Sequence, residues 1–106
     1  MNIFDVNNFK GGWFIGNFSP SVFRTSDFEI AYKTHAKDEE WPTHYHAQAE
    51  EINYLISGNM SINNIELVAP IIFVIDKNEI AKPVFKTDVS LIVVKIPSVI
   101  NDKFEV

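Results

Sequence analysis

Hydrophobic and polar residues alternate along much of this chain in short segments, which is the pattern of β-strands with one buried face. Residues 28–35 alternate imperfectly, and residues 52–57 form a second segment that ends at Gly58. Glycine adopts positive φ without steric cost, so Gly58 suits the turn that would close this strand. Further predicted strands cover residues 71–75, 81–85 and 89–96.

Two of the predicted turns carry residues that favour tight chain reversals. Asn63 and Asn64 separate the apolar segments 60–62 and 65–67. Asparagine tolerates the left-handed backbone conformation of a two-residue turn, so this region predicts a β-hairpin. The sequence Asp-Lys-Asn-Glu at residues 76–79 predicts a similar turn between two further strands.

Helical patterns are almost absent. The only helix-compatible segment, residues 37–41, is too short and ends before Pro42. Aromatic residues, with 9 Phe, 3 Tyr and 2 Trp, favour strand over helix. Many short strands separated by Gly, Pro, Asn and Asp predict an all-β chain, folded as an antiparallel sandwich or barrel.

The length of 106 residues corresponds to a single domain. No linker or repeat interrupts the strand pattern. We predict a barrel core over residues 27–98. Residues 1–26 are expected to form an N-terminal arm with a short strand, and residues 99–106 a peripheral tail.

The composition is typical of a folded globular chain, with 46% hydrophobic and 22% charged residues. The net charge of −5 repels phosphate backbones and anionic lipids, so we predict no nucleic-acid or membrane partner. No apolar run approaches the ~20 residues of a membrane helix. The first residues lack the basic and apolar regions of a secretory signal, which predicts a cytoplasmic location.

Two of the three histidines, His44 and His46, lie two positions apart. In a strand their side chains share one face about 6.6 Å apart, which lets both imidazoles reach one metal ion. A turn after His46 would bring Glu50 or Glu51 opposite them on the next strand. The chain has no cysteine, so any metal must be held by nitrogen and oxygen donors. Two imidazoles and one carboxylate leave open positions, and they suit divalent Fe, Zn, Mn or Ni.

This segment resembles the first motif of the cupin superfamily, in which Gly, His-x-His, Glu and Gly follow at fixed spacing. His44, His46, Glu51 and Gly58 match it. Six residues separate Glu51 from Gly58, as in the motif, so the spacing selects Glu51 as the acidic ligand. Asp38 stands at the motif's leading glycine, and aspartate adopts left-handed conformations more readily than most residues. The resemblance implies a double-stranded β-helix, a jelly-roll barrel that holds a metal ion at its mouth.

The second cupin motif is degraded in this chain. Pro70 takes the place of its glycine, and Phe85 takes the place of its asparagine. Ala81 stands where the family has its fourth ligand, a histidine, and no histidine follows His46. The third histidine, His35, precedes the first motif, and the sequence leaves its direction open.

The predicted site allows more than one function. A metal enzyme would act on a small oxygen-bearing molecule, such as a sugar or an organic acid, as an isomerase, lyase or dioxygenase. Tyr32, Lys33 and Lys95 are then candidate general bases, provided that they face inward. The alternatives are a non-catalytic small-molecule-binding module and a structural dimer with a vestigial metal site.

The strand after the histidines also predicts an interface. If Glu51 faces the interior, then Ile52, Tyr54 and Ile56 face outward. A monomer rarely leaves such an apolar patch in water, so we predict a homodimer that packs partly through this strand.

Overall fold

The computed structural model describes residues 1–106, and its regular structure is almost entirely β-strand. The only helical segments are two 3₁₀ turns, η1 (Val6–Asn8) and η2 (Lys10–Gly12), and no helix is long and apolar enough to cross a bilayer. The all-β prediction is confirmed. The strands are β1 (Trp13–Gly16), β2 (Phe23–Arg24), β3 (Glu29–His35), β4 (His44–His46), β5 (Glu50–Ser57), β6 (Asn59–Ile62), β7 (Ile65–Val68), β8 (Ile71–Ile75), β9 (Pro83–Phe85), β10 (Val89–Ile96) and β11 (Lys103–Glu105).

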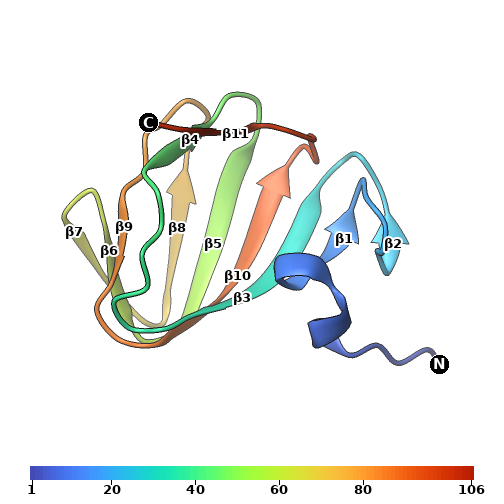
Figure 1. Cartoon of the computed structure of the whole chain (residues 1–106), viewed down its shortest axis with the longest axis horizontal. Coiled ribbons are helices and arrows are strands. Elements are labelled where there is room, and N and C mark those ends of the chain that lie inside the picture. Colours follow the sequence, from blue (N-terminus) through green and yellow to red (C-terminus); the bar gives the residue numbers. More distant parts are fainter.

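A six-stranded sheet in the order β2-β1-β3-β10-β5-β8 forms the main wall of the barrel (Figure 1). β10 lies between β3 and β5 and pairs antiparallel with both. Its register aligns Glu29 of β3, Lys95 of β10 and Glu51 of β5 in one row across the sheet. Directly paired residues point to the same face, so these three side chains lie next to one another.

A three-stranded sheet in the order β7-β6-β9 forms a second wall. Asn63 and Asn64 connect β6 to β7 with φ of 52° and 66°, which confirms the predicted hairpin turn. Asn78, in the turn after β8, also has positive φ, at 66°. β9 begins two residues later than expected, because Ala81 pairs with His44 in an isolated bridge.

β4 and β11 form a two-stranded ribbon that crosses in front of the main sheet (Figure 1). The register pairs Lys103 with His46, and Glu105 with His44. This differs from the expectation of a peripheral tail over residues 99–106. The strand was missed because its three residues are all exposed and show no buried face.

The N-terminal arm reaches the sheet through η2 and β1. Gly12, with φ of 78°, lies where the chain passes over β3. A Cβ atom at this position would come within 1.9 Å of the Tyr32 carbonyl oxygen, so only glycine permits this close approach.

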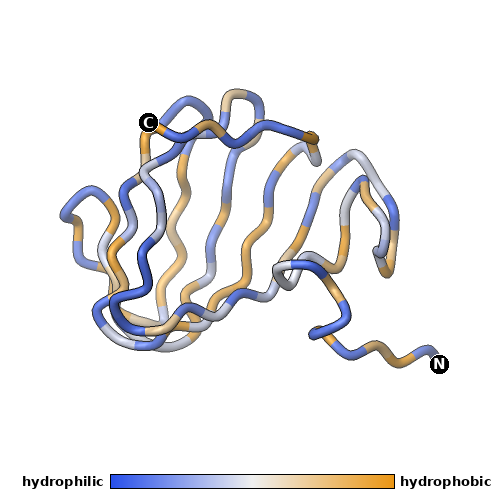
Figure 2. Tube along the Cα trace, in the orientation of Figure 1, coloured by the Kyte–Doolittle hydropathy of each residue, from blue (hydrophilic) through white to orange (hydrophobic).

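The hydrophobic core fills one end of the barrel. Alternation along β5 and β10 points Leu55, Leu91 and Val93 inward, where all three are buried. Figure 2 shows hydrophobic and hydrophilic stretches along the strands of the main sheet. Residues from the smaller sheet complete the cluster, and Glu51 and Lys95 lie toward the opposite end of their strands. The interior therefore has an apolar end and a polar end. The buried members of the core are Leu55, Met60, Leu67, Phe85, Val89, Leu91 and Val93.

The segment before β4 contains no helix. Residues 37–41 form a turn and extended chain, and Asp38 has φ of 63°. The left-handed conformation expected at Asp38 is therefore present. The Asp38 amide donates to the Phe85 carbonyl at 2.9 Å, which ties this loop to β9.

Candidate metal centre

β4 carries the two histidines into the barrel. His44 and His46 are 8% and 4% exposed, and the Tyr45 ring between them stacks on Phe104, with centroids 5.3 Å apart. The alternation of a strand explains why both imidazoles face inward while Tyr45 faces β11 on the outside. Their ring centroids lie 5.3 Å apart.

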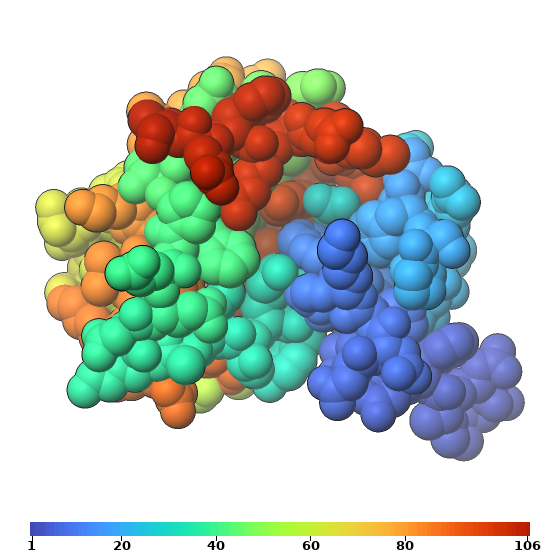
Figure 3. Space-filling view, viewed as in Figure 1, coloured from blue at the N-terminus to red at the C-terminus, as the bar shows by residue number.

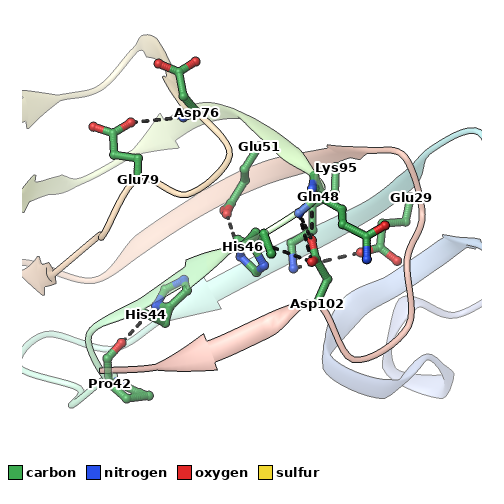
Figure 4. Close-up of polar contacts among 12 residues, drawn as sticks. Glu29, Pro42, His44, His46, Gln48, Glu51, Asp76, Glu79, Lys95 and Asp102 are labelled. Atoms are coloured by element: carbon green, nitrogen blue, oxygen red, sulfur yellow. Dashed lines mark hydrogen bonds and ion pairs between the residues drawn. The ribbon is translucent and has the colours of Figure 1, made fainter.

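Glu51 reaches the histidines from β5, across a short turn. Its Oε2 lies 3.3 Å from His46 Nε2 (Figure 4). One ligand atom from each of His44, His46 and Glu51 lies within 4.8 Å of the others. The neighbouring Glu50 is exposed, so only Glu51 of the two glutamates joins the group.

The turn between the two strands depends on Asp102. This carboxylate is 6% exposed, and it accepts hydrogen bonds from the amides of Ala47, Gln48 and Ala49 at 2.9 to 3.2 Å. These three backbone N–H groups have no partner within the turn itself, so the Asp102 carboxylate supplies their hydrogen-bond acceptor. Asp102 thus fixes the geometry of the turn that connects His46 to Glu51.

The hydrogen bonds around the histidines fit a metal site. His44 Nδ1 lies 2.9 Å from the Pro42 carbonyl oxygen, which can only accept, so Nδ1 carries the proton. The Nε2 lone pair of His44 is then free to bind a metal, as is common for metal-ligating histidines. His46 Nδ1 is buried without a hydrogen-bond partner, and the buried Glu51 Oε2 has only its 3.3 Å contact with His46 Nε2. Unpaired buried groups of this kind are costly, and a bound cation would satisfy the carboxylate.

Burial and charge set the ionisation of these donors. Burial lowers the pKa of His44 in spite of its hydrogen bond to Pro42, which keeps the imidazole neutral. Burial alone would raise the pKa of Glu51, but the contact with His46 and the charge of Lys95 outweigh it and hold the pKa below its ordinary value. A neutral imidazole and an ionised carboxylate are the forms that bind metals.

Ala81 lies directly opposite His44. Its amide donates to the His44 carbonyl at 2.8 Å, and the His44 amide donates back at 3.1 Å. Such a pair places both side chains on the same face, so the Ala81 methyl group lines the pocket beside the His44 ring. No ligand atom is supplied at this position.

The third histidine and the candidate general bases differ in their positions relative to the pocket. The His35 ring stacks on Phe85, with centroids 4.3 Å apart, and its Nδ1 pairs with Glu39. His35 lines the pocket but does not belong to the group of possible metal ligands. Lys33 and Lys95 also line the pocket, whereas Tyr32 does not.

A cavity of about 500 Å³ surrounds the three donors. Trp13, Trp41 and Phe73 contribute apolar walls, and Asn53 and several lysines contribute polar groups. Figure 3 shows a hollow between the N-terminal segment, the residues before and within β4, and the C-terminal strand. The volume suits a small molecule.

Sequence reasoning missed two polar residues of this region and did not assign a third, Asn53, to the site. Lys103 and Asp102 lie in the tail, far along the chain from the motif, and no local pattern connects them to it. Asn53 follows Glu51 by two positions, so strand alternation was the signal that placed it on the inner face.

Solved structures with the same architecture identify the fold. A DMSP lyase, DddQ, from Ruegeria pomeroyi superposes with a TM-score of 0.71 at 12% sequence identity, over 88% of this chain. This chain spans 49% of the length of that lyase. An uncharacterised protein with a double-stranded β-helix domain from Klebsiella pneumoniae gives 0.65 at 19% identity, covering 91% of this chain and 84% of the other.

A cupin-2 domain protein from Shewanella frigidimarina gives a TM-score of 0.57 at 21% identity, covering 68% of this chain and 72% of the other. The chain therefore has the cupin fold, and the predicted double-stranded β-helix is confirmed. No family model matches the sequence, and no curated protein matches it. The similarity to known proteins is therefore found in the structure and not in the sequence.

Proposed function

We propose that this protein binds one divalent metal ion through His44, His46 and Glu51, and acts on a small oxygen-bearing molecule in the surrounding pocket. The observation that carries the proposal is the convergence of two buried histidines and the half-buried Glu51, with donor atoms within 4.8 Å of one another, at a cavity of about 500 Å³. A bound metal of this type supplies Lewis-acid polarisation of a substrate oxygen. The DMSP lyase of the same fold supports a lyase reaction as one such use.

The chain's own residues support binding of a small molecule in this pocket. Trp13, Trp41 and Phe73 line the cavity and limit the access of water to a bound molecule. Lys33 lines the same cavity, and burial lowers its pKa, an effect that the charges of Lys95 and Lys103 reinforce. Positive charge crowded around Lys33 favours its contact with an oxygen acceptor of a bound molecule, so we propose Lys33 as a ligand-binding residue of this pocket.

Metal analysis tests the proposed site directly. Protein purified without affinity nickel or chelator is loaded with Mn²⁺, Fe²⁺ or Zn²⁺, desalted and measured by plasma mass spectrometry. We expect one ion per chain for at least one metal. A His35→Gln variant is the matched control and should bind equally, because His35 lies outside the donor group. Absence of stoichiometric metal from all three samples, and from a fourth loaded with Ni²⁺, would contradict the proposal.

A fourth ligand at position 81 should strengthen the site. We expect Ala81→His to tighten Zn²⁺ binding about 10-fold, because the new imidazole would point to the same side as His44. Competition titration against a zinc-sensitive dye measures the change. The control is Ala81→Leu, which adds similar bulk without a donor and should not tighten binding. Equal affinities for both variants would show that position 81 does not face the metal.

We further propose a homodimer formed through the outer face of the main sheet. Tyr54 and Ile56 of β5, with Ile72 and Val74 of β8, are exposed there. The register joins Tyr54 to Ile72 and Ile52 to Val74, which makes one continuous apolar surface. We propose that a second copy of the chain packs against this apolar surface.

Light scattering coupled to size-exclusion chromatography tests the dimer. We expect wild-type protein to be dimeric at micromolar concentration, and the double variant Tyr54→Lys, Ile72→Lys to be monomeric, because two charges would be buried unpaired. Ile65→Lys changes an equally exposed apolar residue on β7 and should remain dimeric. A monomeric wild-type protein would rule the dimer out.

A further inference from the structure

The pocket is positively charged although the protein as a whole is acidic. Of the nine basic residues in a chain of net charge −5, four lysines line the cavity, against two glutamates. Those charges are concentrated where apolar walls exclude water, which strengthens their field. The lysines are Lys10, Lys33, Lys95 and Lys103, and the glutamates are Glu29 and Glu51.

Two of these lysines stand beside the proposed metal ligands. The register pairs Lys95 with Glu51 across β10 and β5, and Lys103 with His46 across β11 and β4. Side chains at directly paired positions lie on one face with Cβ atoms about 5 Å apart. Positive charge therefore flanks the donor group from both walls of the barrel.

Tryptophan rings hold the lysine head groups in place. Lys33 Nζ lies 5.2 Å from the Trp13 ring centroid, and Lys95 Nζ lies 4.9 Å from it. Lys103 Nζ lies 4.4 Å from the centroid of Trp41. These distances are typical of cation–π contacts. Three lysine head groups already lie against these two rings, so the local charge disfavours a cationic ligand.

The lysine charges are only partly neutralised. Lys95 Nζ lies 3.9 Å from a Glu29 oxygen, and neither Lys33 nor Lys103 has a carboxylate within 4.0 Å. Burial lowers the pKa of Lys33 and of Lys103, and the charge of Lys95 lowers both further. An anion among these groups would relieve their mutual repulsion.

Asn53 supplies a neutral donor on the same cavity. It is 2% exposed, and its Nδ2 group is buried without a hydrogen-bond partner. Because the side chain lines the pocket, a ligand oxygen would satisfy this amide. The donor is therefore available for a ligand that carries oxygen acceptors.

We propose that the pocket selects a small organic carboxylate, whose negative group is held by Lys33 and Lys103 and whose further oxygen accepts a hydrogen bond from Asn53. This assignment rests on the proposed function, since it names the substrate class of the same site. Neutral sugars and cations lack the charge that the lysines require.

Binding of lactate and of its neutral isostere lactamide tests the substrate class. Titration of ¹⁵N-labelled, zinc-loaded protein by NMR should show lactate binding at least 10-fold tighter than lactamide, with shifts at the Asn53 side chain. The double variant Lys33→Gln, Lys103→Gln should lose at least 10-fold in lactate affinity. The control Lys77→Gln, outside the cavity, should retain it.

Zinc content and the thermal unfolding midpoint, measured on the same samples, separate the two proposals. Stoichiometric zinc in the double variant, with lactate affinity lost, supports the carboxylate assignment, as does recovery of that affinity in Lys33→Arg, Lys103→Arg. Equal affinity for lactate and lactamide, or full lactate affinity in the glutamine variant, would overturn it while leaving the metal site intact. Failure of the wild-type protein to bind zinc or any other metal would instead refute the proposed function.

Discussion

Glu51→Gln is expected to reduce the affinity for Mn²⁺ or Zn²⁺ by at least about 100-fold, because loss of a direct ligand should exceed the 10- to 100-fold cost of changing its supporting groups. The substitution keeps the size of the side chain but removes the only negative charge among the three donors. An amide is also a much weaker ligand than a carboxylate. Isothermal titration of the metal-free protein measures the loss.

The adjacent glutamate provides the matched control. Glu50→Gln removes the same charge one residue earlier, on the exposed side of β5, and should change metal affinity by no more than a few-fold. An equal loss in both variants would mean that net charge alone attracts the metal. A larger loss in Glu50→Gln would reverse the assignment of the acidic ligand.

Asp102→Ala is expected to lower the free energy of unfolding by about 3 kcal/mol, because it leaves several turn amides without an acceptor. The amides of Ala47, Gln48 and Ala49 all donate to this one carboxylate, and Ala49 is itself buried. Urea denaturation of the metal-free protein measures the loss. Metal affinity should fall as well, since the same turn sets the separation of His46 and Glu51.

Asp5→Ala is the control for this prediction. Asp5 also accepts a hydrogen bond from a backbone amide, that of Asn7 at 2.9 Å, but it does so at an exposed position. Water replaces the lost acceptor there, so the cost should be about 1 kcal/mol or less. Similar losses in the two variants would show that Asp102 makes no special contribution to the turn.

Local patterns predicted most of the sheet. Apolar runs bounded by turn residues or proline predicted the strands at residues 71–75 and 89–96, and both are present. The turn at Asn63 and Asn64 followed from the tolerance of asparagine for positive φ. The motif spacing distinguished Glu51 from Glu50, and the structure brings Glu51 beside the histidines.

Long-range contacts explain what the sequence did not predict. Asp102 accepts a hydrogen bond from the Ala49 amide, although it lies 53 residues further along the chain. No periodic pattern in the sequence links such distant positions. β11 is short and exposed, so it has no buried face to mark it as a strand. Lys103 could therefore not be assigned to the pocket, although it faces His46 through a register that only the folded chain creates.

The pairing of β11 with β4 links the C-terminal residues directly to the histidine strand. The Val106 amide donates to the Thr43 carbonyl at 2.9 Å, one residue before His44. Fusion partners, purification tags or probes joined after Val106 are thus expected to disturb the strand that carries His44. Met1 is fully exposed on the opposite arm of the molecule, and labels for spectroscopy or immobilisation belong there.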